Sequence, residues 1–372
     1  MKDNLSDFKA QIAANNKGIE LLQELIRQYG LRYVQAYMKY IQDAAAESVQ
    51  DMLVEISERN GLKEVDTVTC EDYMDDGNPI HLALTIDRKN RTAVFDFSQS
   101  GPQVIGNWNA PKSVTNSAII YCLRCLVKSD IPLNQGCMNP ITIKYPEGYS
   151  ILNPSPDAAV VGGNVLTSQR LTDIILKAFQ AAADSYGDMN NLTFGTQEWG
   201  YYETIGGGSG AGPTWDGKSG VQCHMTNTRI TDPEVLELRY PVILRQFTIR
   251  ENSGGKGKHY GGNGLIREIE FLEGMQVSIL SERRAFAPNG ICGGQNGKRA
   301  MTIMIRGDGV EVNFGGKNTD FFEPGSRIKV LTAGGGGYGK EEEREDHKKK
   351  HAYDEPFSST GSLGAQKKDS RN

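Results

Sequence analysis

The densest run of side chains able to do chemistry is HMTNTRITDPE, which spans residues 224–234. It places an imidazole, three threonine hydroxyls, an amide, a guanidinium and two carboxylates within eleven residues. Such a run is costly to bury unless every polar group is hydrogen-bonded. It therefore predicts helix caps, a polar site or an interface. In a polar site, His224 would transfer protons and Arg229 would hold an anionic group.

His224 is the one histidine of five that lies among dense polar side chains. His81 falls in a predicted strand, His259 in a glycine-rich turn, and the other two near the C-terminus. A second polar motif, MNNLTFG at 189–195, contains two adjacent amides, Asn190 and Asn191. These amides would either orient a substrate amide or form an Asx turn.

GPTWDGKS at 212–219 fits the phosphate-binding pattern G-x-x-x-x-G-K-[ST]. A working loop of this kind opens a helix whose N–H groups hold the phosphate. Here Gly220 and a stretch without helical periodicity follow, Pro213 removes an N–H donor, and Trp215 crowds the loop. The overlapping G-x-G-x-x-A at 206–211 also lacks a following helix. We therefore predict no nucleotide site in this chain.

Two further motifs have structural interpretations beside the functional ones. Cys122 and Cys125 form a C-x-x-C, but a zinc site needs about four ligands and the sequence has no second pair. We interpret both as core residues of a helix and predict no metal site here. GGNVLTSQR at 162–170 joins a glycine loop to a helix start, which would either hold an anion with Gln169 and Arg170 or be an ordinary cap.

The elements that must position these residues begin with a helical segment over 4–58. Apolar residues recur there at spacings of three, four and seven on both sides of Gly30, which is predicted to end the first helix as an αL cap. The two amphipathic helices form a hairpin or a long broken helix. They cannot bury their apolar faces alone, so we expect an exposed apolar face through which the chain self-associates.

Residues 65–190 are predicted to mix strands and helices. IHLALTID and RTAVFDFS flank RKN as a β-hairpin, and NPITIKY forms a short strand. Helices are predicted from 113 to 128 and over 167–187, with Thr167 or Ser168 as the N-cap of the second.

Residues 190–335 alternate strand-like runs with glycine clusters. The chain holds 43 glycines in 372 residues, well above the usual share of about 7%. The clusters predict tight turns and close approaches between backbones. Residues 340–372 are rich in charge and nearly free of apolar residues, so we predict a disordered tail. The fold class is α+β: a helical N-terminal segment, a mixed α/β middle and a glycine-rich β-dominated C-terminal region.

Charge, hydropathy and cysteine content indicate which partners and which cell compartment to expect. The chain carries 41 basic and 46 acidic residues, a net charge of −5, so we expect neither a nucleic acid nor a membrane as partner. No stretch approaches the roughly 20 consecutive apolar residues of a membrane span, and the N-terminus has no apolar signal core. The six cysteines are sparse and irregularly spaced, which predicts reduced thiols and a cytosolic location.

Several motifs together are similar to those of one family. Among them are NPSPDAAVVGGNVLTSQR, MNNLTFG, YYETIGGGSGAGP, HMTNTRITDPEVLELRYPV, GGKGKHYGGNGLIREIEF, SERRAF and TAGGGGYG. In unbroken order from Asp3 to Gly339, the chain resembles the hydantoinase B/oxoprolinase family. The most similar version is the C-terminal part of the eukaryotic 5-oxoprolinases, which use ATP to open 5-oxo-L-proline to L-glutamate in the γ-glutamyl cycle.

The resemblance implies cofactors and partners bound outside this sequence. Family chains carry a long stretch before the equivalent of Asp3, with His- and Asp-rich motifs similar to metal ligands. Complete enzymes add a hydantoinase A-like half, similar to sugar kinases, that binds ATP. We therefore expect a fragment or one piece of a split enzyme, whose N-terminal helices pack on the absent region. The complete enzyme is expected to use ATP and a divalent metal and to form a homo-oligomer, a dimer.

The resemblance also suggests a reaction in which ATP phosphorylates the lactam oxygen and water attacks the resulting imidate. We predict His224 as general base or acid, Arg229 for carboxylate or phosphate charge, Asn190 and Asn191 for the amide, and Glu203 as a further acid or base. Two alternatives stay open. One is a B-type subunit that acts on a hydantoin or carboxylates a ketone, and the other is a catalytically silent structural or assembly module.

Overall fold

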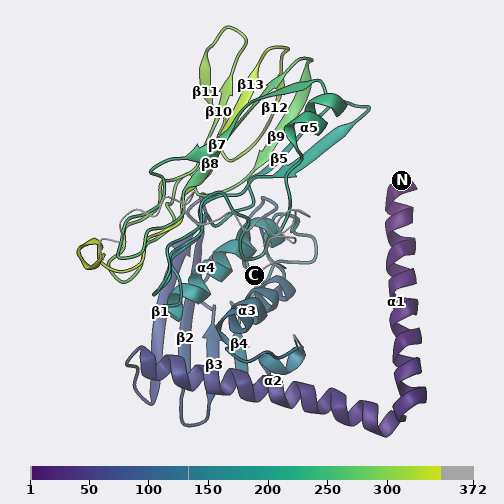
Figure 1. Ribbon diagram of the computed structural model, residues 1–372, viewed down its shortest axis with the longest axis vertical. Helices are drawn as coiled ribbons and strands as arrows, with labels where there is room; N and C mark the ends of the chain where they lie inside the picture. Colours follow the sequence, from purple (N-terminus) through teal and green to yellow (C-terminus); the bar gives the residue numbers. More distant parts are fainter. Residues whose placement is uncertain (1, 133, 345–372) are drawn as a thin grey trace, which may run out of the picture.

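Two long helices open the chain and meet at Gly30. The computed structural model describes residues 2–132 and 134–344, and α1 (Lys2–Tyr29) and α2 (Leu31–Arg59) confirm the predicted helical region. Gly30 has φ 84° and ψ 146°, an extended conformation open to glycine, so the predicted αL cap is wrong. The helices form an elbow, not a hairpin: α2 runs along the body, and α1 stands apart from it (Figure 1).

The first sheet follows α2 and has the order β1-β2-β3-β4. Its strands are β1 (Val65–Tyr73), β2 (Pro79–Asp87), β3 (Thr92–Asp96) and β4 (Ile141–Lys144). β1 to β3 are antiparallel, which confirms the predicted hairpin around RKN, whereas β4 joins β3 in parallel. β2 alternates buried and half-buried residues along its whole length, as expected for a sheet with one face in the core.

Helices α3 (Lys112–Leu126) and α4 (Ser168–Ala178) pack together and share the core of the first sheet with α2. The predicted helix over 167–187 is too long. The observed helix α4 begins after a π-helical turn, Gly163–Thr167, and ends at Ala178, because the chain that follows is extended and bonds to loops. Ser168 does not cap the helix, since its hydroxyl donates to the Asn164 carbonyl, and the Thr167 hydroxyl donates to Trp108.

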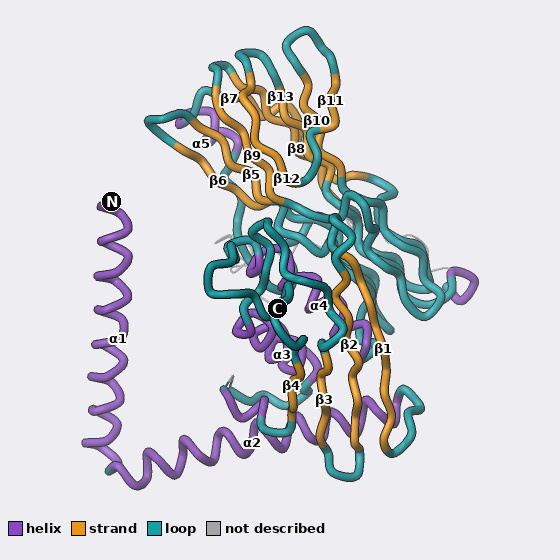
Figure 2. Tube along the Cα trace, turned by 180° about the vertical axis from the view of Figure 1, so that it is seen from behind, coloured by secondary structure: helices purple, strands orange, loops and turns teal. Residues whose placement is uncertain are grey.

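The C-terminal half is a sandwich of two sheets, ordered β11-β10-β13-β8-β7 and β12-β9-β5-β6. A second core around Phe194, Phe271 and Phe322 lies between them. The short helix α5 (Pro233–Arg239) packs on β7 (Figure 2). The strands are β5 (Asn191–Gly195), β6 (Gly200–Thr204), β7 (Val242–Arg250), β8 (Gly264–Phe271), β9 (Met275–Leu280), β10 (Met301–Ile305), β11 (Glu311–Asn313), β12 (Lys317–Phe322) and β13 (Arg327–Leu331).

Between the sandwich and the first sheet lies a glycine bundle, made of extended segments 206–212, 253–264, 289–297 and 333–339 (Figure 2). Its segments bond main chain to main chain. Gly335 N–H donates to the carbonyl of Gly262 at 2.9 Å, and Gly262 N–H donates to Ser209 at 2.9 Å. A Cβ on Gly335 would lie 2.0 Å from the Ser209 oxygen. Many of the glycines therefore allow two backbones to approach closely. This confirms the predicted close approaches between backbones.

The ordered fold continues past the predicted boundary at 339. Glu341–Glu343 form a 3₁₀ turn, and Arg344 pairs with Asp216 at 2.9 Å, so the prediction of disorder from 340 is wrong for these residues. The remainder of the predicted tail, 345–372, lies outside the described residues. Throughout the two described ranges, every helix is too short or too polar to cross a bilayer.

Candidate functional site

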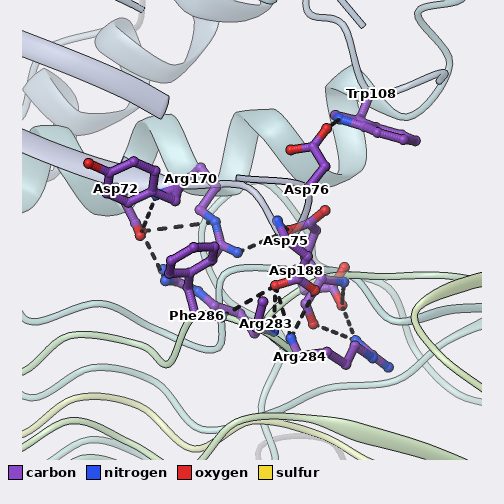
Figure 3. Close-up of polar contacts among 12 residues, drawn as sticks. Asp72, Asp75, Asp76, Trp108, Arg170, Asp188, Arg283, Arg284 and Phe286 are labelled. Carbon is purple, nitrogen blue, oxygen red and sulfur yellow. Dashed lines mark hydrogen bonds and ion pairs between the residues drawn. The ribbon is translucent and has the colours of Figure 1, made fainter. Parts of the chain in front are cut away.

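Helix α4 presents a row of polar side chains on one face. Gln169, Arg170, Asp173 and Lys177 recur at spacings of three and four, which places them side by side. Arg170 and Asp173 are buried almost completely. Opposite them lie two segments that are distant in sequence, 184–190 and 281–289. We call the polar side chains of α4 and of these two segments, with the side chains they contact, the charged junction (Figure 3).

Arg283 lies at the centre of the charged junction. Its Nη2 is 2.8 Å from Asp173 Oδ2 and 3.2 Å from Asp184 Oδ2, and its Nη1 is 2.9 Å from Asp72 Oδ2. Burial raises the pKa of Asp173 and of Asp184, since loss of water disfavours the charged carboxylate. The neighbouring charge of Asp184 raises the pKa of Asp173 further. One guanidinium thus holds three carboxylates in place.

The backbone at Gly187 lies close to the guanidinium groups of Arg170 and Arg283. Gly187 has φ 58°, a left-handed conformation. A Cβ there would lie 2.5 Å from Arg283 Nε and 2.9 Å from Arg170 Nη1. Both of these nitrogens are buried without a hydrogen-bond partner among the residues described. Gly187 is therefore fixed both by its backbone conformation and by the space available.

The turn between β1 and β2 ties the first sheet to the segment SERRAF. Asp75 accepts the backbone N–H of Arg284 at 2.8 Å, and its own N–H donates to Glu282 Oε2 at 2.8 Å. Asp76 accepts the indole N–H of Trp108 at 3.1 Å (Figure 3). The charged junction thus holds the first sheet against the C-terminal half.

His224 lies at the partly open edge of the charged junction, with 13% of its side chain exposed. Its Nε2 is 2.8 Å from Ser185 Oγ and 3.7 Å from Asp173 Oδ1, while its Nδ1 is 3.2 Å from Tyr121 Oη. Burial lowers the pKa of His224 to about 4, so the ring is neutral at pH 7. A neutral, positioned imidazole is suited to accept a proton.

The hydrogen bonds around Ser185 permit a tautomer of the neutral ring in which Nε2 is the acceptor. Ser185 Oγ accepts the backbone N–H of Gly210 at 3.0 Å and can donate its own proton to His224 Nε2. In that tautomer, Nδ1 carries the ring hydrogen and donates to Tyr121. Asp173 and Ser185 both lie near Nε2. The three residues therefore do not form a chain in which the hydroxyl contacts one ring nitrogen and the carboxylate contacts the other.

Gln169 holds the turn that carries His224. Its Nε2 donates to the carbonyls of Asp188 at 3.2 Å and Cys223 at 3.1 Å, and its Oε1 accepts from Met225 N–H at 3.3 Å. Arg170 is paired with Glu282 at 3.1 Å. The two side chains considered for an anion site are therefore engaged within the protein.

The two predicted asparagines are buried beside the sandwich. Asn190 donates to the Ile205 carbonyl at 3.0 Å, and its Oδ1 is buried without a partner among the described residues. Asn191 donates to the Leu280 carbonyl at 2.8 Å and accepts from Tyr202 Oη at 2.6 Å. Asn191 is thus fully engaged, whereas Asn190 retains an unused acceptor.

Glu203 and Arg229 lie in different surroundings. Glu203 is buried in the sandwich, where its two oxygens accept from Arg267 at 2.6 and 2.8 Å. Arg229 is exposed, and within the described ranges it has neither a hydrogen bond nor an ion pair. The structure does not join the five predicted residues by direct contacts.

Three contacts of His224 were missed at the sequence level: Tyr121, Asp173 and Ser185. Tyr121 comes from the predicted helix over 113–128, and the other two come from the stretch predicted as one helix over 167–187. The available signal was the presence of acidic residues among apolar ones in that stretch, which indicates buried charge. Its interpretation required the bend after Ala178.

The described residues do not form a phosphate cradle at GPTWDGKS. Gly217 N–H donates to the Tyr260 carbonyl at 2.7 Å and Lys218 N–H donates to Ser209 Oγ at 2.8 Å. The next helix along the described chain is α5, which begins at Pro233. Over the same residues, no group of three or more His, Cys, Asp or Glu is arranged to hold a metal.

Residues 1–341 match the family described as Hydantoinase B/oxoprolinase. The chain belongs to this family. It is 60% identical over 346 residues to 5-oxoprolinase 1 of Arabidopsis thaliana and 58% identical over 342 residues to 5-oxoprolinase of Dictyostelium discoideum. These matches cover 91% and 92% of this chain, and the chain spans 27% of the length of each relative.

Two less similar proteins match over most of this chain as well. A Pseudomonas protein that is named as the B component of a D-/L-hydantoinase is 27% identical over 377 residues, which cover 94% of this chain and 63% of that protein. The crystal structure of an ATP-dependent caprolactamase from Pseudomonas jessenii superposes with a TM-score of 0.78 at 22% identity. It covers 91% of this chain and 62% of that one, so the two share a fold.

Proposed function

We propose that this chain forms part of an ATP-dependent 5-oxoprolinase that hydrolyses 5-oxo-L-proline to L-glutamate. The observation that carries the proposal is the identity of 58–60% to proteins named 5-oxoprolinase. It is about twice the 27% identity to the hydantoinase component, so the hydantoinase alternative is less well supported. The proposed location is the cytosol, and the proposed partner is a hydantoinase A-like half.

A lactam resists water because its amide is stabilised by resonance. ATP, bound by the partner half, would supply the phosphoryl group that makes the ring carbon electrophilic, and a metal would bind outside the described residues. No step at the charged junction requires either group. The role proposed for this chain is the later proton transfer, when water attacks, the ring C–N bond breaks with the nitrogen leaving as an amine, and the phosphoryl group is released as inorganic phosphate.

His224 is proposed as the general base. Its neutral Nε2 takes a proton from the attacking water, directly or through the Ser185 hydroxyl at 2.8 Å. In its ionised form, Asp173, 3.7 Å from Nε2, stabilises the resulting imidazolium. The imidazolium then returns the proton to the leaving ring nitrogen. Tyr121 fixes the other ring nitrogen and so holds the imidazole in one orientation.

The remaining predicted residues have weaker support. Asn190 is proposed to orient the substrate amide, because its buried Oδ1 lacks a partner among the described residues. Arg229 is proposed to contact an anionic group from the exposed side. Glu203 is the weakest candidate, because Arg267 engages both of its oxygens. Asn191 would support the site through Tyr202.

The test uses a complete enzyme in which this chain replaces the matching segment of the Arabidopsis relative. We expect His224→Ala to lower kcat for 5-oxoproline-dependent glutamate formation by about 100-fold or more, as for loss of a general base. His259→Ala, a change at a histidine outside the charged junction, is the matched control. Undiminished coupled hydrolysis by His224→Ala would remove this residue from the mechanism.

Two further assays separate the alternatives. Hydantoin offered to the same enzyme in place of 5-oxoproline distinguishes the two substrate classes. The chain alone is expected to show no ATP hydrolysis on addition of 5-oxoproline, as a structural module or an incomplete enzyme would. Turnover by the chain alone would contradict the proposed division between the two halves.

A further inference from the structure

A cavity along one face of helix α3 adjoins the candidate site, and we call it the α3 cavity. Its volume is about 450 Å³, within the range of about 300–1,000 Å³ that is typical of small-molecule sites. It is lined by Ser117, Ile120, Tyr121, Arg124 and Asn134. The first four recur three or four residues apart along α3, so they share one face of the helix.

Tyr121 belongs both to the α3 cavity and to the candidate site. Its Oη lies 3.2 Å from His224 Nδ1. Its ring meets the imidazole edge to face, with 5.8 Å between the two ring centroids. A ligand in the α3 cavity would therefore lie against the residue that fixes the orientation of the imidazole.

Arg124 gives the α3 cavity a positive charge without a protein partner. The residue is half-buried, and over residues 2–132 and 134–344 its guanidinium has neither a hydrogen bond nor an ion pair. The other lining residues are uncharged. Burial raises the pKa of the Tyr121 phenol and of the Cys125 thiol, so these two neighbours stay neutral at pH 7. The guanidinium is therefore available to an anionic ligand.

The arginines of the charged junction are not available in this way. Arg170 pairs with Glu282 at 3.1 Å, Arg284 lies 3.5 Å from Asp188, and Arg283 is shared by three carboxylates. These cations balance buried charges of the protein itself.

Two other cavities of the described chain contain an arginine, and both also contain carboxylates. Glu71 lines the cavity of Arg299, and Asp308 lines that of Arg306. The α3 cavity, by contrast, combines Arg124 with uncharged residues. This combination suits a small molecule that has one negative charge and an apolar body.

We propose that the α3 cavity binds the carboxylate of 5-oxoproline through Arg124. This inference rests on the proposed function, and it concerns where the carboxylate is held and not the route of the proton. A guanidinium can donate two parallel N–H bonds to a carboxylate. Ile120 and the ring of Tyr121 provide an apolar wall for the methylene groups of the lactam ring.

This assignment gives the chain a means of selecting its substrate. 5-Oxoproline carries a carboxylate on the ring carbon next to the nitrogen, whereas unsubstituted hydantoin has none. The carboxylate takes no part in the bond changes at the lactam carbonyl. Arg124 is therefore expected to act on substrate binding, equally in the ground state and the transition state, and not on the chemical step.

The first test compares Arg124→Met with the wild type in the complete enzyme that carries this chain in place of the Arabidopsis segment. We expect KM for 5-oxoproline to rise about 10- to 100-fold from the loss of a charge-assisted contact, with kcat changed less than about threefold. Arg124→Lys keeps the charge without the planar fork and should give an intermediate KM.

Lys128→Met is the matched control for this test. Lys128 lies just beyond α3 and pairs with Glu55, and 77% of its side chain is exposed. Its removal changes the net charge by the same amount and should leave KM unchanged. An unchanged KM in Arg124→Met, or an equal rise in both variants, would overturn the proposal.

The second test separates carboxylate binding from the shape of the cavity. 2-Pyrrolidinone is the same ring without the carboxylate. Its inhibition constant against 5-oxoproline should be the same in the wild type and in Arg124→Met. If the substitution weakens both compounds to the same extent, Arg124 maintains the cavity and does not hold the carboxylate.

A failure of the proposed function would be visible separately. A wild-type complete enzyme that does not hydrolyse 5-oxoproline would contradict the proposed function. Titration calorimetry of 5-oxoproline with that enzyme would still test the α3 cavity. Binding that Arg124→Met abolishes would support the assignment, and absence of binding to the wild type would overturn it.

Discussion

The charged junction and helix α1 distribute their side chains in opposite ways. At the charged junction, Arg170, Arg283 and Glu282 are fully buried, whereas on α1 a phenylalanine is 62% exposed. The buried charges find their complements within the described chain, at distances near 3 Å. The exposed apolar side chains of α1 find no such complement among the described residues. Buried charges at the charged junction thus have their partners within the described chain, whereas the exposed apolar side chains of α1 do not.

The largest expected effect comes from removing the central cation of the charged junction. Arg283→Met would leave Asp72, Asp173 and Asp184 buried without their shared partner. Breaking a buried ion pair on one side costs about 3–5 kcal/mol in unfolding free energy. Urea denaturation followed by circular dichroism measures this loss.

The control for this change is Arg245→Met. Arg245 pairs with Glu270 at 2.7 Å, but 47% of its side chain is exposed. A surface pair contributes about 1 kcal/mol or less. Equal losses of unfolding free energy in the two variants would show that burial does not strengthen the contribution of the ion pairs at the charged junction.

Glycine substitutions sharpen the same comparison. Gly187→Ala places a Cβ 2.5 Å from Arg283 Nε at φ 58°, which is expected to cost about 3–4 kcal/mol from strain and overpacking together. Gly18→Ala lies on α1 with nothing within 4 Å of the added Cβ. It should stabilise the helix by about 0.5–1 kcal/mol. The two melting curves should shift in opposite directions, and a loss of stability in Gly18→Ala would contradict the account of α1.

A smaller effect than those of Arg283→Met and Gly187→Ala is the pH dependence contributed by His224. Its pKa is about 4 in the fold and about 6.5 when unfolded, so the unfolded state binds the proton first as the pH falls. The contribution of His224 to the unfolding free energy is therefore present above pH 6.5 and declines toward pH 4, by about 2–3 kcal/mol at pH 4.5. His224→Gln should lose less stability than the wild type between pH 7 and 4.5.

A second buried group acts in the opposite direction over part of this range. Burial raises the pKa of Asp188 to about 6, so its contribution declines as the pH rises from about 4 to 6. Since Asp188 is present in both proteins, the difference between wild type and His224→Gln isolates the histidine. Parallel pH profiles in the two proteins would contradict the buried, neutral state of His224.

The elements with strong periodicity could be predicted from sequence. The apolar periodicity of α1, the alternation along β2 and the apolar run of α3 each lie within one element, and the sequence predicted all three elements. The end of α4 could not be predicted. Residues after Ala178 have good helix propensity, but their backbone groups bond to distant loops, as Ala183 N–H does to Ala211. Tertiary bonding overrides local preference there.

At the candidate site, the sequence predicted His224 but not the side chains in contact with it. His224 attracts attention because polar residues surround it in the sequence, whereas Asp173 and Ser185 lie among apolar neighbours. Their proximity to His224 depends on how α4, the segment after it and residues 222–226 converge in space. Polar density along the chain cannot show such convergence, and for the same reason it selected Glu203, whose partner Arg267 is 64 residues away.

The central strand of the glycine bundle has a consequence for biosynthesis. Segment 333–339 bonds to the other three glycine segments: Gly335 to Gly262, Gly337 to Gln295, and Gly208 to Ala333. A chain emerging from the ribosome therefore cannot complete this region until residues 333–339 have been translated. The amides of the earlier segments that bond to 333–339, such as that of Gly255, which donates to Gly335, stay unpaired until then. A stop codon before residue 333 would remove the segment that joins them.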